Sequence, residues 1–239
     1  MQFKFIKEQI SEFKENNCPV ISIDCKDKVT IGNYSRKGTI YTPQGKPIKT
    51  KDHDFVDEET QIVHPYGVYC LNDNTGFVNL GLSRDTSEFA ANSIYMWWKN
   101  YGSKKFKKAD KILILSDSGG SNRAAGYMWK EQLFMLATLI GKDIYVSHYP
   151  AGKSKFNPIE HRLFSIISMN WAGVPIESIE LLANLINNTK TTTGLNVECS
   201  IDNNTYELNS RLLSNDERED IPITFRGPTT KNLNYIIHT

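Results

Sequence analysis

Three acidic residues in this chain stand where a carboxylate is unfavourable unless a partner balances its charge. Asp24 lies near the end of an apolar run, Val20–Cys25, and Asp117 directly follows a second one, Ile112–Ser116. Glu160 lies at the start of an amphipathic segment. If the fold brings the three carboxylates together, a hard divalent cation is the partner that suits such oxygen ligands. The chemistry would then be metal-assisted reaction at a phosphoryl group.

Each acid also has a simpler structural role when it is considered alone. Asp24 could turn the chain near a strand end, and Asp117 could cap the turn that precedes the next helix. For Glu160 the alternative is stronger, because Asn157, Pro158 and Glu160 have the spacing of a capping box. The position of Asp117, at the carboxyl end of a buried strand and before a glycine loop, nevertheless favours ligand binding.

The elements that must position these acids alternate in type along the chain. Apolar residues at helical spacing predict helices over residues 3–13, 86–101, 124–140, 158–171 and 175–188. Apolar or alternating runs predict strands over residues 20–25, 29–31, 67–71, 76–81, 112–117, 143–148 and 197–201. An antiparallel beginning followed by alternating strands and helices predicts an α/β domain with a mixed sheet.

A long polar insertion, residues 36–64, follows the first strands. Connections of this length inside a compact domain are usually functional or partly disordered, and a flap that contacts the substrate is one interpretation of it. The chain of 239 residues has 28 basic and 27 acidic side chains. Because this balance is close to neutral, a surface that binds nucleic acid must be a local patch.

The cellular compartment follows from two further features of the sequence. The four cysteines are scattered and form no Cys-x-x-Cys pair, which fits a reducing environment better than a disulfide framework or a zinc site. No run of about 18 apolar residues is present, so we expect no membrane span. A cytoplasmic protein is therefore expected.

The order of the three acids resembles the Asp-Asp-Glu triad of transposases and integrases that have a ribonuclease H-like fold. Local segments resemble one family of bacterial insertion sequences in particular, the Rhodopirellula-type transposase DDE-domain family. The segments that carry this likeness are Pro19–Asp24, Gly32–Tyr34, His53–Phe55, Pro65–Tyr69, Ser118–Asn122, Ser154–Ser165, Asn170–Trp171, Thr189–Gly194 and Asn234–Ile236. The resemblance runs over nearly the whole chain.

Two kinds of departure from the family pattern stand out. Phe156 stands where the family typically has tryptophan, and Lys153 where it typically has threonine. Neither change alters the three acids. Family members also carry a helix-turn-helix region ahead of the catalytic domain, whereas this sequence begins at the leading helix of that domain. Autonomous recognition of transposon ends is therefore not expected of this sequence.

The resemblance implies a fold, a site and a reaction. The fold would be a ribonuclease H-like mixed β-sheet flanked by helices, with a DDE catalytic domain over residues 1–190 and a C-terminal extension over residues 191–239. Asp24, Asp117 and Glu160 would be the catalytic residues and would hold two Mg²⁺ or Mn²⁺ ions. The reaction would be phosphodiester hydrolysis and strand transfer. The partners would be transposon ends, target DNA and further copies of the chain, near the bacterial nucleoid.

Polar neighbours of the three acids are expected to assist them. Three are candidates for orienting ligands or water, with surface or capping roles as the alternative: His161, Asn122 and Asn157. Three basic residues are placed to meet the DNA backbone: Arg123, Lys153 and Lys155. The lysines between residues 104 and 108 would extend that path, although a solvated loop explains them better.

Three other functions remain open at the level of sequence. A structure-specific nuclease of the same fold would cleave DNA without joining strands. A truncated or co-opted transposase domain would only bind DNA or dimerise, and the missing front region favours it. A small-molecule phosphatase with Asp117 as nucleophile is disfavoured, because Gly119 occupies the position where a second Asp is expected.

Overall fold

The computed structural model describes residues 1–52, 57, 60–208, 214–228 and 232–239. Its helices are α1 (Gln2–Glu15), α2 (Ser87–Trp97), α3 (Ser103–Lys105), α4 (Tyr127–Ile140), α5 (Ser165–Asn170), α6 (Ile179–Asn187) and α7 (Asn215–Glu219). Short helical segments of different pitch are η1 (Trp98–Gly102), η2 (Gly120–Asn122), η3 (Ser154–Phe156) and η4 (Glu160–Phe164). The strands are β1 (Val20–Cys25), β2 (Val29–Thr30), β3 (Ile62–Cys70), β4 (Thr75–Gly81), β5 (Lys111–Ser116), β6 (Asp143–His148), β7 (Asn196–Asp202), β8 (Ile223–Phe225) and β9 (Asn234–Ile237).

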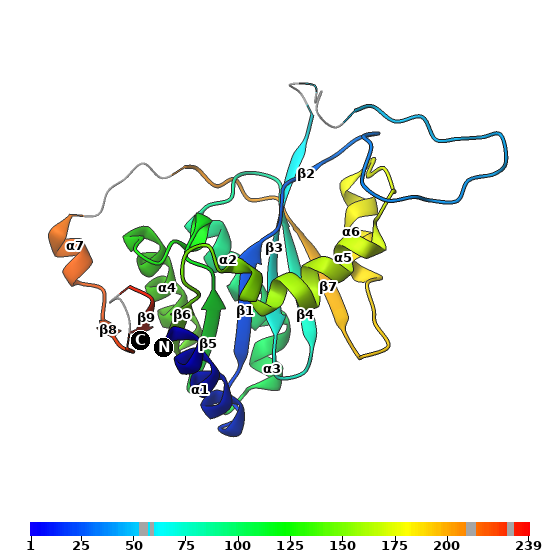
Figure 1. Cartoon of the computed structure of the whole chain (residues 1–239). Coiled ribbons are helices and arrows are strands. Elements are labelled where there is room, and N and C mark those ends of the chain that lie inside the picture. The colour runs from blue at the N-terminus through cyan, green and yellow to red at the C-terminus, as the bar shows by residue number, and fades with distance from the viewer. Residues whose placement is uncertain (53–56, 58–59, 209–213, 229–231) are drawn as a thin grey trace.

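One mixed sheet organises the chain (Figure 1). Its strand order is β7-β4-β3-β1-β5-β6-β9-β8, with β2 added to β3. In the central five strands, β3 alone runs antiparallel to the others. This is the order expected of a ribonuclease H-like sheet, so the predicted α/β class with a mixed sheet is confirmed.

Local signals explain where the main elements begin and end. Helix α1 presents Ile6 and Phe13 to the core and stops before Asn17, whose φ of 57° is left-handed. Strands β3 and β4 are joined by a tight turn in which Asn74 also has a positive φ, 59°. Helix α4 ends at Gly141, the left-handed residue that commonly terminates helices.

Two apolar clusters hold the helices on the sheet. The larger one joins residues of α1, α2 and α4 to the central strands. The second joins η4, α5 and α6 to β3, β4 and β7, and Figure 1 shows α5 crossing in front of the sheet. The strands after residue 190 belong to the same sheet, since β7 pairs with β4 and β9 with β6.

Several details differ from the expectations. The helix expected from residue 124 begins at Tyr127, after a loop that holds the buried Ala124. The helix expected from residue 175 begins at Ile179, because Ser178 caps it through the backbone N–H of Leu181. No described helix has both the length and the apolar character needed to cross a bilayer. All four cysteines are free.

Candidate active site

The register of β1 and β5 brings the first two acids together. These strands are parallel, with Val20 opposite Leu113 and Ser22 opposite Leu115. Continuing this register by two residues places Asp24 level with Asp117. One oxygen of each carboxylate accepts a backbone N–H locally, at 2.8 Å from Cys25 for Asp24 and at 3.2 Å from Gly119 for Asp117.

Hydrogen bonds to β1 fix the start of the segment that carries Glu160. The Ser22 hydroxyl donates to Asn157 Oδ1 at 2.5 Å and accepts the N–H of Ile159 at 3.0 Å. Asn157 Nδ2 donates to the carbonyl of Ile23 at 3.0 Å. The capping-box interpretation of Asn157 and Glu160 is therefore wrong, because the Asn157 side chain is committed to the strand that carries Asp24. These bonds place the Glu160 segment directly on that strand.

Glycines on the hairpin allow η4 to lie close to the sheet. Gly67 pairs with Asp24 across β1 and β3. A Cβ atom at Gly67 would lie 2.5 Å from Phe164 Cε1 and 2.8 Å from Ile159 Cδ1, closer than carbon atoms can approach. A Cβ atom at Gly76 would likewise lie 2.5 Å from Leu163 Cδ1. The absence of side chains at these two positions thus sets the distance between η4 and the strands.

The electrostatics of Asp24 show that the three acids interact. Burial raises the pKa of Asp24 from 3.8 to about 8, and repulsion by Asp117 and Glu160 contributes in the same direction. Without a cation this carboxyl is therefore mostly protonated at neutral pH. Within the described residues, no three His, Cys, Asp or Glu side chains already form a set that could hold a metal ion. The acids are near neighbours that have not converged into a coordination sphere.

A buried histidine supports the backbone at Asp117. His148 Nδ1 lies 2.6 Å from the carbonyl oxygen of Asp117, so this nitrogen must carry the proton and donate. Its Nε2 then accepts the hydroxyl of Tyr235 at 3.1 Å. Complete burial lowers the pKa of His148 to about 4, which keeps the imidazole neutral. The late strand β9 is in this way connected to the end of β5.

The predicted assisting residues fall into two groups. Asn122 and Asn157 are buried beside the acids, and Asn122 Oδ1 accepts the hydroxyl of Tyr66 at 2.7 Å. His161 is exposed, and its ring contacts the carbonyl of Lys155 rather than an acid. The predicted DNA-contacting side chains are all exposed: Arg123, Lys153 and Lys155.

Two charged residues near the acids were not predicted from the sequence as part of the site. The Lys26 ammonium lies 5.7 Å from the ring centroids of both Phe164 and Trp171. Burial lowers the pKa of Lys26, whereas Asp27 and Glu160 raise it. A lysine directly after a buried strand is a weak signal of this role, because most lysines there are solvated.

Asp85 is the second of these residues. Burial raises the pKa of Asp85. The pKa of Cys25 is raised mainly by burial and then by the charge of Asp85. The pKa of Tyr66 is raised mainly by burial, then by Asp24 and then by Asp85. Asp85 is thus electrostatically connected to the strands of the site. In the sequence it precedes the helix cap Thr86 and reads as a loop residue, so only tertiary structure reveals its position.

Two solved structures are similar to part of this chain: a Mos1 transposase paired-end complex with left transposon end (TM-score 0.48, 14% identity, 73% of this chain and 48% of that one) and a Mos1 strand transfer complex (TM-score 0.48, 12% identity, 74% and 49%). This chain spans about half the length of those proteins. No curated protein matches it. A family model described as Rhodopirellula transposase DDE domain matches residues 1–239.

Proposed function

We propose, from the premise that this chain belongs to the Rhodopirellula transposase DDE-domain family, that it is the catalytic domain of a DNA transposase. The reaction would be hydrolysis of phosphodiester bonds at transposon ends followed by strand transfer into target DNA. Asp24, Asp117 and Glu160 are the proposed catalytic residues. The observation that supports the proposal is that Asp117 and Glu160 both lie near enough to Asp24 for their charges to raise its pKa.

The donor set fits a hard divalent cation. Three carboxylates that repel one another, one of them largely buried, gain stability when a Mg²⁺ or Mn²⁺ ion balances their charge. We propose that the three acids hold two such ions. When bound, the ions would supply Lewis-acid stabilisation of the reacting phosphate and lower the pKa of a coordinated water.

The surrounding residues of the chain would position and stabilise this site. Ser22 and Asn157 fix the start of the Glu160 segment on β1, and His148 fixes the backbone at Asp117. Supports of this kind orient metal ligands, and their loss typically reduces activity about 10- to 100-fold. Asn122 and His161 remain proposals for the orientation of ligands or water.

DNA would approach a site bordered by positive charge. Four basic side chains flank the acids or follow them in the sequence, and we propose that they contact phosphates: Lys26, Arg123, Lys153 and Lys155. Synapsis of two transposon ends would require more than one copy of the chain, so we propose a homo-oligomer on DNA. The cell compartment would be the one that holds the bacterial chromosome.

The substitution Asp117→Asn tests the assignment. It keeps the size of the side chain but removes a charged ligand, so we expect Mn²⁺-dependent nicking of supercoiled plasmid to fall by more than about 100-fold, beyond the loss typical of supporting residues. Circular dichroism should show an unchanged fold. The matched control is Asp143→Asn at the opposite end of the neighbouring strand β6, which should keep full activity. Asp117→Asn activity within tenfold of the wild type would refute the assignment.

A second assay separates a transposase from a nuclease of the same fold. A transposase domain should join a DNA oligonucleotide with a free 3′-hydroxyl end to plasmid DNA, whereas a nuclease should only cut. Failure of both reactions, together with absence of Mn²⁺ binding by calorimetry in the presence of DNA, would leave a DNA-binding or dimerising module.

A further inference from the structure

One projecting segment of this nearly neutral chain carries basic residues without any acidic ones. Residues 35–51, here called the basic arm, contain five basic residues and no Asp or Glu: Arg36, Lys37, Lys46, Lys49 and Lys51. The rest of the chain is left with 23 basic and 27 acidic residues, so it is net negative. The basic arm thus has a charge opposite to that of the remaining molecule.

The base of the basic arm is a built structure. The backbone N–H of Ser35 donates to the carbonyl of Lys51 at 2.8 Å, and that of Lys51 donates to Asn33 at 2.8 Å. Asn33 Nδ2 donates to the carbonyl of Lys49 at 2.8 Å, and the Arg36 guanidinium donates to the carbonyl of Thr30 at 2.8 Å. The two ends of the segment are therefore held together, and the part between them is presented as one unit.

The same base rests on the loop that follows the Glu160 helix. The N–H of Gly173 donates to the carbonyl of Lys37 at 2.9 Å, and the N–H of Gly32 donates to Ile176 at 2.7 Å. The contact at Gly38 is so close that a Cβ there would lie 2.7 Å from the Gly173 nitrogen. Because η4 and α5 are continuous with this loop, the basic arm has a fixed position relative to Glu160.

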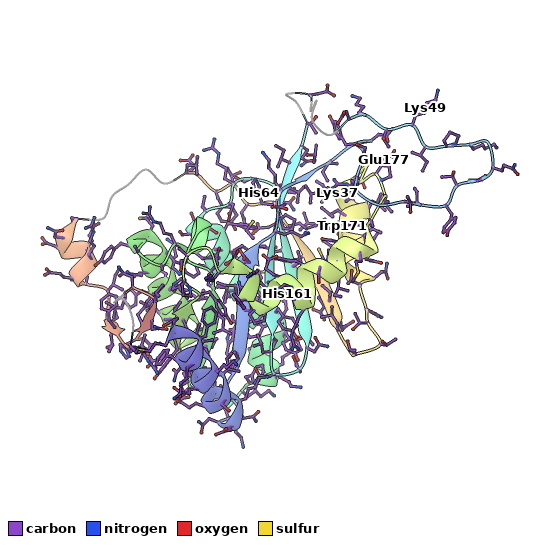
Figure 2. All side chains as sticks on the ribbon, viewed as in Figure 1. Lys37, Lys49, His64, His161, Trp171 and Glu177 are labelled. Carbon is purple, nitrogen blue, oxygen red and sulfur yellow. The ribbon has the colours of Figure 1, made fainter. Side chains whose placement is uncertain are left out.

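Beyond its base the basic arm extends away from the body of the molecule (Figure 1). Every residue from 37 to 52 is exposed, and Figure 2 shows Lys49 on the projecting part of the segment and Lys37 at its base, near Trp171 and Glu177. Lys51 pairs with Asp57 at 2.7 Å. Within the described part of the chain, by contrast, no acid pairs with the three lysines Lys37, Lys46 and Lys49. These three lysines on the extended basic arm suit a partner with regularly spaced negative charge.

We propose that the basic arm binds the phosphate backbone of duplex DNA beyond the active site and thereby orients the substrate relative to Glu160. This inference rests on the proposed function, because it takes DNA as the substrate. An extended chain advances about 3.3 Å per residue. Because the basic arm runs out and back, about eight of its residues span its length, so its tip can reach about 25 Å from its base. Duplex DNA presents about one phosphate charge per 1.7 Å of its axis, which gives the basic arm many equivalent contacts and no sequence preference.

The salt dependence of DNA binding tests this proposal. We would measure binding of a 30-base-pair duplex by fluorescence anisotropy at several salt concentrations, in a chelator that prevents cleavage. Each phosphate contact contributes about 0.9 to the slope of log K against log salt concentration. The triple variant Lys37→Gln, Lys46→Gln, Lys49→Gln should therefore have a slope shallower by about 2–3 than that of the wild type.

The matched control replaces three lysines that lie outside every proposed DNA contact, Lys14→Gln, Lys99→Gln and Lys142→Gln, and should leave the slope unchanged. If the wild type nicks plasmid with Mn²⁺ while the basic-arm variant keeps the full slope, the basic-arm proposal alone is overturned. A wild type that neither binds nor nicks DNA overturns the proposed function as well.

The exposed apolar residues of the basic arm indicate an alternative partner for it, a second copy of the chain. Ile40, Tyr41 and Ile48 are exposed by 37%, 106% and 50%. If Tyr41→Ser abolishes a dimer seen by sedimentation without DNA, and the lysine variant binds DNA like the wild type, the basic arm is a contact between copies. An unchanged oligomeric state together with the shallower slope supports DNA as the partner.

Discussion

At the scale of single residues, the site depends on neutral groups as much as on charged ones. The bond from His148 Nδ1 holds the backbone carbonyl of Asp117, and we expect it to orient the carboxylate of that residue. That bond requires a neutral imidazole whose other nitrogen accepts from Tyr235. Burial provides this neutrality by lowering the pKa of His148 to about 4.

His148 should therefore make stability depend on pH. Its pKa is depressed in the folded state relative to about 6.5 in the unfolded chain, so its contribution is fully present above pH 6.5 and is lost as pH falls through 4. The loss amounts to at most about 3 kcal/mol. Denaturant unfolding between pH 7 and 4 should show a smaller decrease in stability for His148→Gln than for the wild type.

The exposed His161 provides the control for that measurement. His161→Gln should follow the wild-type decrease in stability across the same pH range, because its side chain is solvated. If His148→Gln also follows it, the imidazole of His148 is not held neutral by burial.

At the scale of elements, the activity depends on how closely a helix lies on the sheet. Gly67 is the partner of Asp24 in the β1–β3 ladder, and the rings and methyl groups of η4 occupy the space over it. The position of Glu160 above Asp24 is thus determined by the smallest residue of the neighbouring strand. Ser22 determines the lateral position of the same segment.

Gly67→Ala tests this relation. The added methyl group must displace Phe164 or Ile159, so we expect a stability loss of about 1–3 kcal/mol, typical of an overpacked core. Nicking activity should fall by up to about 100-fold, because misplacement of a reacting group by about 1 Å has that effect. Thermal unfolding and plasmid nicking measure the two changes.

A control of similar stability separates displacement from general weakening. Ile237→Val on β9 removes one buried methylene and typically costs about 0.5–1.5 kcal/mol. Its nicking rate at 25 °C should stay within twofold of the wild type. An equal loss of activity in both variants would show that Gly67 acts through stability alone.

At the scale of the whole molecule, distant parts of the chain are joined near the site. Gln2 in the first helix exchanges two side-chain hydrogen bonds with Asn234, at 2.9 and 2.8 Å, and donates to the carbonyl of His148 at 2.9 Å. Figure 1 shows the two termini close together. The division of the chain at residue 190 stays a prediction, although β7 and β9 belong to the common sheet.

Divalent cations should stabilise the whole fold. A ligand that binds only the folded state adds about 2.7 kcal/mol at 100 times its Kd. For a chain of this length that corresponds to a rise in Tm of about 5–10 °C. Differential scanning fluorimetry with Mn²⁺ should show this rise for the wild type. Glu160→Gln should show little or none, while a comparable rise in that variant would place the cation elsewhere.

The sequence alone determined the acids and most of the elements that carry them. Asp24 and Asp117 stand out because their strands are otherwise apolar, and local periodicity depends on neighbouring residues only. The burial of Trp98, which is only 7% exposed, could not be predicted in this way, because the spacing of apolar residues on a helix says nothing about what covers it. The insertion could be located but not described, and its motif His53–Phe55 lies outside the described residues.

Only the tertiary structure decided how these parts meet. Asn157 had the sequence of a helix cap, yet its side chain bonds β1, because long-range packing offered a buried partner that local geometry cannot reveal. Asp85 and Lys26 joined the site for the same reason. The residue types indicate which chemistry is available, while the strand register brings Asp24 level with Asp117 and the clearance at Gly67 sets how closely the Glu160 segment lies on the sheet. Both are properties of chain segments far apart in sequence, which no local pattern encodes.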